Sequence, residues 1–270
     1  MSESLVRFRA TLPSDRRWEP VGSGESGAEV FRSADGSRYA KCADPGRAAD
    51  LALERDKVLW LDAHDIPGPQ VLDWRTDADG GACLITSAVH GVPADAVAVQ
   101  TLSSAWASIA DTVRRLHELP AEDCPFDRGL ARMFAIAQDV VVRGAVHTEF
   151  LPEEQQATPP TVLLTRLATE LGPRMTQESA EAVVCHGDLC LPNIILDPDT
   201  HSVAGFVDLG RLGLADPYAD IALLLANARE SWRDERRAEE ADRAFADRYG
   251  IELDAARQRF FLYLDPLTWD

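Results

Sequence analysis

The stretch VCHGDLCLPNIILD, residues 184–197, places a histidine, two acids and an asparagine between two short apolar runs. His186, Asp188 and Asn193 have the spacing H-x-D-x-x-x-x-N, and the apolar segment AGFV then leads into Asp208. Phosphoryl transfer needs a carboxylate that accepts the hydroxyl proton, and hard oxygen donors that hold magnesium on the phosphates. The stretch therefore predicts a catalytic loop, with Asp188 as base and with Asn193 and Asp208 as Mg²⁺ ligands.

A glycine-rich loop lies upstream of it. In VGSGESGAEV, the glycines Gly22, Gly24 and Gly27 have the spacing G-x-G-x-x-G, which by itself is a weak signal. In a Rossmann fold this loop opens a helix. Here the runs AEVFRS and SRYAKCA follow, joined by Asp35 and Gly36, which is a hairpin signal. The loop is interpreted as a flap over phosphates, and a flexible turn remains the alternative.

A lysine and a glutamate form the third candidate group. Lys41 ends the predicted strand SRYAK, and Glu54 lies in the following helical stretch, at helical spacing from Leu51, Val58 and Leu61. A carboxylate in an apolar stripe needs a cation as partner. Lys41 is the nearest candidate on a strand, and its ammonium would then face nucleotide phosphates. The alternative is an ordinary acid on the helix surface.

Composition describes an ordinary globular chain. Of 270 residues, 46% are hydrophobic and 27% charged, so a sizeable core is expected. The first ten residues, MSESLVRFRA, have no apolar segment of the signal-peptide kind, and the run IALLLANA is too short to cross a bilayer. The five cysteines are scattered without a C-x-x-C pair, which favours reduced thiols over zinc ligands. A cytoplasmic protein without membrane association is expected.

The net charge of −18 limits the partners. An acidic surface repels phosphate backbones, so nucleic acid is not expected as a partner. It attracts cations, which leaves two interpretations open: solubility alone, or the attraction of a cationic small molecule.

The predicted secondary structure of the chain changes near residue 90. Residues 1–90 read as strands around one helix, at 48–63, whereas residues 91–270 read as helices at 102–119, 130–146, 160–175 and from 218 onward, with a β-rich middle at 182–208. The acidic, proline-rich segment 149–160 resembles a linker. The predicted fold class is α+β, with a small sheet lobe (1–90) that binds nucleotide and a larger, mainly helical lobe (91–270) that carries catalysis and substrate binding.

The order of these motifs resembles the protein-kinase signature set. Three departures are clear: Gly187 stands where protein kinases have arginine, DLG replaces their usual triplet, and no A-P-E follows. The segments CHGDLCLPNIILD, VDLGRLGLADPYADIALLLA and FFLYLDPLTWD resemble the aminoglycoside phosphotransferases, and WLDAHDIPGPQVLDW, GVPA and CPFDRGLARMF bring the chain nearest to those that act on the 3''-hydroxyl of streptomycin. The resemblance covers nearly the whole chain and implies a bilobal kinase-like fold.

The resemblance also implies roles for individual residues. It implies transfer of a phosphoryl group from ATP, with Mg²⁺, to a hydroxyl of a cationic antibiotic, giving resistance. Asp188 matches the base, Asn193 and Asp208 the magnesium ligands, and Lys41 the phosphate-binding lysine with Glu54 as its partner. The implied nucleotide contacts are Gly24 and Ser26 in the flap and the hinge backbone around Ser87 and Val89, and the implied drug contacts are Arg211, Glu230, Asp265 and Asp270.

Three functions remain open from the sequence. The first is an antibiotic kinase acting as a monomer, and Ala226, where kanamycin-type members place an arginine, favours a drug other than kanamycin. The second is a kinase for a small metabolite such as choline or a sugar. The third is a nucleotide-binding regulatory module without catalysis, against which the complete set of motifs argues.

Overall fold

The chain forms two compact units. The computed structural model describes residues 8, 11–14, 17–21 and 28–269. The first unit comprises Met1–Gly91 and Ala204–Gly210, and the second comprises Val92–Val203 and Arg211–Asp270. Residues 204–210 therefore return to the first unit, although the sequence analysis assigns them to the larger lobe, 91–270.

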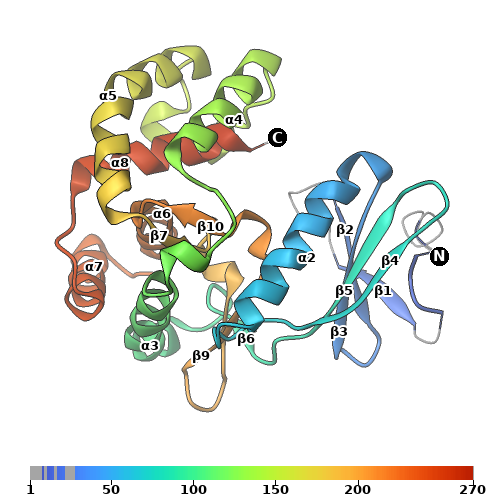
Figure 1. Ribbon diagram of the computed structural model, residues 1–270. Coiled ribbons are helices and arrows are strands. Elements are labelled where there is room, and N and C mark those ends of the chain that lie inside the picture. The colour runs from blue at the N-terminus through green and yellow to red at the C-terminus, as the bar shows by residue number, and fades with distance from the viewer. Residues whose placement is uncertain (1–7, 9–10, 15–16, 22–27, 270) are drawn as a thin grey trace. The chain divides into compact units, whose positions relative to one another are not determined.

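The first unit is built on an antiparallel sheet of order β1-β2-β3-β5-β4 (Figure 1). Its strands are β1 (Trp18–Val21), β2 (Glu29–Ser33), β3 (Arg38–Ala43), β4 (Val71–Thr76) and β5 (Ala82–Ser87). The predicted hairpin is confirmed: β2 pairs with β3, and Gly36 takes a φ of +70°, which glycine adopts without steric cost. Asp35 Oδ1 accepts hydrogen bonds from Ser33 Oγ and Ser37 N, which closes the turn.

One helix, α2 (Ala48–Asp62), packs on this sheet after the short 3₁₀ turn η1 (Pro45–Arg47). It buries Leu51, Val58 and Leu61 at helical spacing, as expected, and also Lys57. The burial of this stripe fixes the rotation of α2 about its axis, and so fixes where Glu54 points.

The second unit is mainly helical. Its long helices are α3 (Val99–His117), α4 (Leu130–Arg143), α5 (Pro160–Glu181), α6 (Tyr218–Arg229), α7 (Glu235–Tyr249) and α8 (Ala255–Leu264). Its short 3₁₀ turns are η2 (Ala121–Asp123), η3 (Thr148–Phe150), η4 (Glu153–Gln155), η5 (Leu191–Asn193) and η7 (Asp265–Thr268). β7 (Val183–Cys185) pairs with β10 (Gly213–Ala215), and β6 (Val92–Pro93) pairs with β8 (Ile194–Leu196). β9 (Val203–Phe206) then carries the chain back into the first unit, where η6 (Leu209–Arg211) begins.

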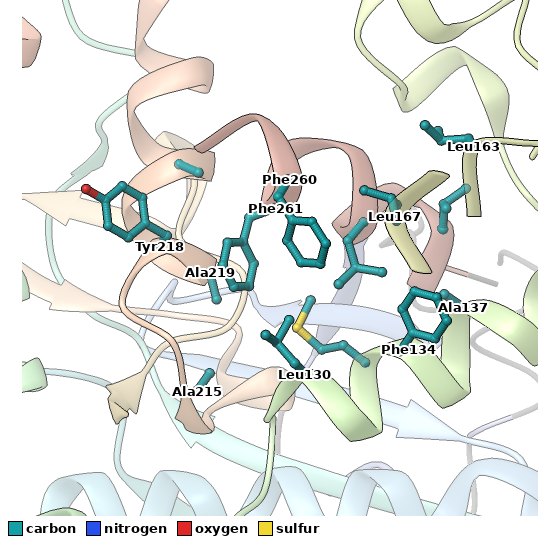
Figure 2. Close-up of a cluster of buried hydrophobic side chains, with 14 of the residues drawn as sticks. Leu130, Phe134, Ala137, Leu163, Leu167, Ala215, Tyr218, Ala219, Phe260 and Phe261 are labelled. Carbon is teal, nitrogen blue, oxygen red and sulfur yellow. The ribbon is translucent and has the colours of Figure 1, made fainter. Parts of the chain in front are cut away.

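The core of the second unit lies where α4, α5, α6, α8 and η7 meet. Figure 2 shows Leu130, Leu167 and Phe260 directed into this common interior, and each is at most 2% exposed. Leu151 also belongs to this cluster, although it lies in the segment that the sequence analysis interprets as a linker. Leu151 is thus anchored in the apolar interior, whereas the other residues of the segment are exposed or partly exposed, as expected for a linker.

Two helix ends differ from the sequence-based expectation. The helix expected over 130–146 ends at Arg143, because Gly144 adopts a left-handed conformation that closes the helix. The helix expected over 160–175 continues to Glu181, with Pro173 inside it. Tertiary packing against α4 and α8 therefore outweighs the local cost of the proline. In the part of the chain that the structure describes, no helix is both long and apolar enough to span a membrane.

Truncation of a side chain in this core should cause a large loss of stability. Leu167→Ala removes most of a buried side chain, so we expect the free energy of unfolding to fall by about 2–5 kcal/mol. Met175→Ala on the same helix, where the side chain is 40% exposed, is the matched control and should change it by no more than about 0.5 kcal/mol. Urea unfolding followed by circular dichroism measures both, and equal effects would contradict this assignment of the core.

Candidate active site

The loop that carries Asp188 begins where β7 ends. Gly187 adopts a φ of +81°, and a Cβ added there would lie 2.2 Å from the carbonyl oxygen of Arg211. Conformation and space therefore both require glycine next to Asp188. His186 is fully buried, and its Nδ1 accepts a hydrogen bond from Asp188 N at 3.3 Å. His186 thus orients the loop.

A buried carboxylate holds the backbone of this loop. Asp220 on α6 is 0% exposed, and its oxygens accept hydrogen bonds from His186 N at 2.6 Å and Gly187 N at 2.8 Å. His117 Nε2 on α3 is a third partner, at 3.1 Å. Burial acts to raise the pKa of Asp220, but the hydrogen bond from His117, the attraction of the His117 and His186 imidazoles and the hydrogen bond from Gly187 N outweigh it, and the pKa lies below the usual aspartate value. Asp220 therefore remains ionised in the interior.

Asn193 holds the side chain of Asp188. Its Nδ2 donates to the Asp188 carbonyl oxygen at 2.9 Å and to Asp188 Oδ2 at 3.3 Å. The turn η5 that carries Asn193 is itself fixed, because Leu191 N donates to Asn227 Oδ1 on α6 at 2.8 Å. The structure thus brings the two sequence-predicted residues together. These hydrogen bonds use the side-chain nitrogen of Asn193 and do not involve its side-chain oxygen, Oδ1.

The first unit brings together Lys41, Glu54 and Asp208. Lys41 Nζ lies 2.8 Å from Glu54 Oε2 and 3.0 Å from Asp208 Oδ1, so the expected ion pair with Glu54 is confirmed. Burial alone would lower the pKa of the Lys41 ammonium, but the attraction of the two carboxylates raises it above the usual lysine value. Burial raises the pKa of Glu54, against the attraction of Lys41. The lysine is therefore charged at physiological pH.

Asp208 has an unusual backbone. Its φ is +59°, which few residues other than glycine adopt, and its side chain is 47% exposed. Lys57 Nζ on α2 donates to the carbonyl oxygen of Gly210 at 2.6 Å, which holds the turn that follows Asp208. Backbone strain of this kind is typical of functional sites. The sequence analysis missed Lys57, although a lysine within the apolar stripe of α2 was a usable signal.

The hinge and the flap differ in what the structure describes. Ser87 ends β5, and its N–H donates to Gln70 O at 2.9 Å, while Val89 packs against Gly205. Gly24 and Ser26 lie outside the described residues, as do the other two flap glycines, Gly22 and Gly27.

The carboxylate of Asp265 is occupied by residues of this chain. It is 6% exposed, and its Oδ1 lies 3.3 Å from both Arg128 and Arg211. Trp269 Nε1 donates to the other oxygen at 3.0 Å, and the Arg211 guanidinium lies 5.0 Å from the centre of the Trp269 ring. Burial lowers the pKa of Arg128 to about 10, so Arg128 stays charged at neutral pH. Arg128 was not found from the sequence, where nothing distinguishes it from a surface arginine.

The remaining candidate drug contacts are dispersed. Glu230 is exposed just after the C-terminal end of α6, and Asp270 lies outside the described residues. Within the second unit the structure therefore groups Asp188 with Asn193 and Arg211 with Asp265, and places Glu230 with neither pair.

Comparison with known proteins gives the chain a family. Residues 17–260 match the model of the phosphotransferase enzyme family. A streptomycin 3''-kinase of Streptomyces griseus is 61% identical over 93% of this chain and 92% of its own, and an aminoglycoside 3'-phosphotransferase of Streptomyces fradiae is 38% identical over 92% and 94%. The structure of aminoglycoside phosphotransferase APH(3'')-Id from Streptomyces rimosus, in complex with ADP and streptomycin, is 59% identical over the full length of both chains, with a TM-score of 0.94. These similarities confirm the resemblance and the fold class inferred from the sequence: the chain belongs to the phosphotransferase enzyme family.

Proposed function

We propose that this enzyme transfers the γ-phosphoryl group of ATP to the 3''-hydroxyl of streptomycin and thereby confers resistance to the drug. The observation that carries the proposal is the similarity, over the full length of both chains, to a phosphotransferase whose structure contains ADP and streptomycin. The side chains described above fit the same reaction: a fixed carboxylate in the second unit, and a charged lysine between two acids in the first.

Asp188 is the proposed base. Its backbone is fixed through the loop that Asp220 holds, and its Oδ2 is held by Asn193. A carboxylate with a fixed orientation can accept the proton of an attacking hydroxyl without first rearranging, which is how positioning lowers a barrier in phosphoryl transfer.

Lys41 is the proposed phosphate ligand. Its ammonium is charged and is held by Glu54, so it can contact a phosphate oxygen without losing its position. At the end of β5, the carbonyl of Ser87 and the N–H of Val89 offer an acceptor and a donor to adenine, because the N–H groups of Ser87 and Ala88 already bond to Gln70 and Ser37. Gly24 and Ser26 remain proposed contacts of the phosphates.

Asp208 and Asn193 are the proposed magnesium ligands. Both present oxygen, which Mg²⁺ prefers. Asp208 keeps an exposed carboxylate beside Lys41, and the Asn193 amide directs its nitrogen to Asp188 and so leaves its oxygen for a cation. When bound, Mg²⁺ would neutralise charge on the phosphates. The donors that the chain provides therefore fit the metal.

The proposed drug contacts are acidic, because streptomycin carries two guanidinium groups, which pair well with carboxylates. Glu230 is exposed and is available for a direct contact, and Asp270 remains a further candidate. Asp265 already binds Arg128 and Arg211, so we assign it an indirect role. It holds the C-terminal turn η7 and Trp269, while Arg211 lines the same turn.

The proposal predicts phosphorylation of streptomycin. With ATP and Mg²⁺, mass spectrometry should detect one added phosphate on the drug, while kanamycin and choline should be poor acceptors. Asp188→Ala should lower kcat by about 10²–10⁴-fold, as loss of a general base does. Phosphate on choline or another metabolite, and none on streptomycin, would favour a metabolite kinase instead.

The ion pair between Lys41 and Glu54 predicts that ATP affinity falls when Glu54 is neutralised. Glu54→Gln removes one charged partner of Lys41, and since such hydrogen bonds contribute about 1.5–3 kcal/mol, KM for ATP should rise at least about tenfold. Asp50→Asn, an exposed acid on the same helix, is the control and should leave KM unchanged. Initial rates over a range of ATP concentrations measure both variants, and identical behaviour would remove Glu54 from the site.

The metal assignment predicts a changed magnesium requirement. Asp208→Asn keeps an oxygen and tolerates the positive φ, but it loses the negative charge. The Mg²⁺ concentration for half-maximal activity should rise by roughly tenfold, because ligand charge tunes affinity for the ion. Asp199→Asn, at an exposed position in the preceding turn, should have no effect. An unaltered magnesium titration in Asp208→Asn would show that Asp208 is not a ligand.

A further inference from the structure

A buried series of hydrogen bonds runs from α7 to the catalytic loop. Tyr249 Oη lies 2.7 Å from His117 Nδ1, and His117 Nε2 lies 3.1 Å from Asp220 Oδ2. Asp220 in turn accepts hydrogen bonds from His186 N and Gly187 N. All five residues belong to the second unit. Tyr249 is thus connected, through two side chains, to the backbone that immediately precedes Asp188.

We propose that Tyr249 and His117 are positioning residues: the Tyr249 hydroxyl donates to Nδ1 of the His117 tautomer that Asp220 selects, and so holds the ring that fixes the catalytic loop. The inference rests on the proposed function only in assigning catalysis to Asp188.

The tautomer follows from the partners. Asp220 is ionised and can only accept, so His117 Nε2 must carry a hydrogen. In a neutral ring Nδ1 then has a lone pair and needs a donor, which the Tyr249 hydroxyl provides. Burial and the nearby acidic groups raise the pKa of Tyr249, so its hydroxyl keeps its proton. Without that hydroxyl, the buried Nδ1 lone pair loses its donor, and the ring can turn away from Asp220 to find another.

Loss of that donor would act on the loop. Asp220 would keep only the two backbone N–H groups as hydrogen-bond partners for a charge that water does not reach. A buried charge with too few donors is costly, and the segment can respond by shifting toward other geometries. Since Asp188 follows Gly187 directly, a displacement of this backbone moves the base. A misplacement of about 1 Å can lower a rate by roughly 10²-fold.

A metal ion is the competing explanation for this cluster. One ligand atom each from His117, Cys185 and Asp220 lie within 4.8 Å of one another. The Cys185 thiol, however, donates to the Asp216 carbonyl at 3.4 Å, and burial raises its pKa, so it is not the thiolate that a metal would need. Both ring nitrogens of His117 also have partners. The cluster is therefore satisfied as a hydrogen-bond network.

The chain offers a clean variant and a matched control. Tyr249→Phe removes only the hydroxyl, and its ring can keep its stacking on Phe245, at 5.8 Å between centroids. Tyr218→Phe is the control. Tyr218 is 1% exposed and makes two hydrogen bonds through its hydroxyl, to Glu252 O and from Asp254 N, but neither partner belongs to the catalytic loop.

The kinetic test is a double-mutant cycle. Tyr249→Phe should lower kcat for streptomycin phosphorylation by about tenfold with both KM values unchanged, as for other residues that orient a reacting group from behind it. Tyr218→Phe should lower the melting temperature and leave kcat unchanged. His117→Gln offers an N–H to Asp220 but has no atom at the Nδ1 position. In that background Tyr249→Phe should change kcat less than about twofold. Additive effects, or equal effects of the two tyrosine variants on kcat, would overturn the proposal.

The tautomer can be measured without activity. ¹⁵N spectra of histidine-labelled protein distinguish the two tautomers, and the loss of signals in His117→Gln assigns this residue among the six histidines. We expect the Nε2–H tautomer in the unmodified protein, and in Tyr249→Phe a shift of the His117 Nδ1 signal that marks the lost hydrogen bond. An unchanged His117 spectrum in Tyr249→Phe refutes the positioning role of Tyr249, whatever the kinetics. The expected spectra with no transfer to streptomycin would instead reject the proposed function and leave the hydrogen bond from Tyr249 to His117 standing.

Discussion

The buried charge of Asp220 is the constraint on which the catalytic half of the structure depends. A carboxylate with no exposed surface must be fully paired, and the first donors available to it are the backbone N–H groups of His186 and Gly187. α6 holds this acid among apolar side chains, so the loop cannot move without leaving a charge unpaired. The pairing that this burial requires thus makes the backbone rigid next to Asp188, the proposed base.

The charged group of the first unit differs, because the proposed phosphate ligand Lys41 must remain accessible to the nucleotide. Lys41 lies between Glu54, which α2 buries, and Asp208, which is about half exposed. Glu54 holds the ammonium of Lys41 from the buried side, whereas Asp208 lies on the side that is open to solvent. The positive φ of Asp208 and the bond from Lys57 to Gly210 keep the turn in a conformation that the chain would otherwise rarely adopt. The strain is local, and the hydrogen bonds around it offset its cost.

The C-terminal turn illustrates why a count of acids does not describe a binding surface. The chain carries a net charge of −18, yet Asp265 is shared by Arg128 and Arg211, so this cluster has an excess of positive charge. The cluster holds Trp269 in place through a hydrogen bond and a cation–π contact. The exposed Glu230 therefore remains the better candidate for the proposed contact with a cationic drug.

The sequence by itself determined what local chemistry dictates: the hairpin at Gly36, the stripe that turns Glu54 inward, and the loop containing Asp188, because turn residues, helical periodicity and motif spacing are properties of neighbouring residues. Only the tertiary structure decided that Leu151 joins the core and that Asp265 is already paired. It alone brought Tyr249 and His117, 132 residues apart, into one network with Asp220. The physical reason is that burial and pairing of a polar group depend on partners distant in the chain, which no local pattern encodes.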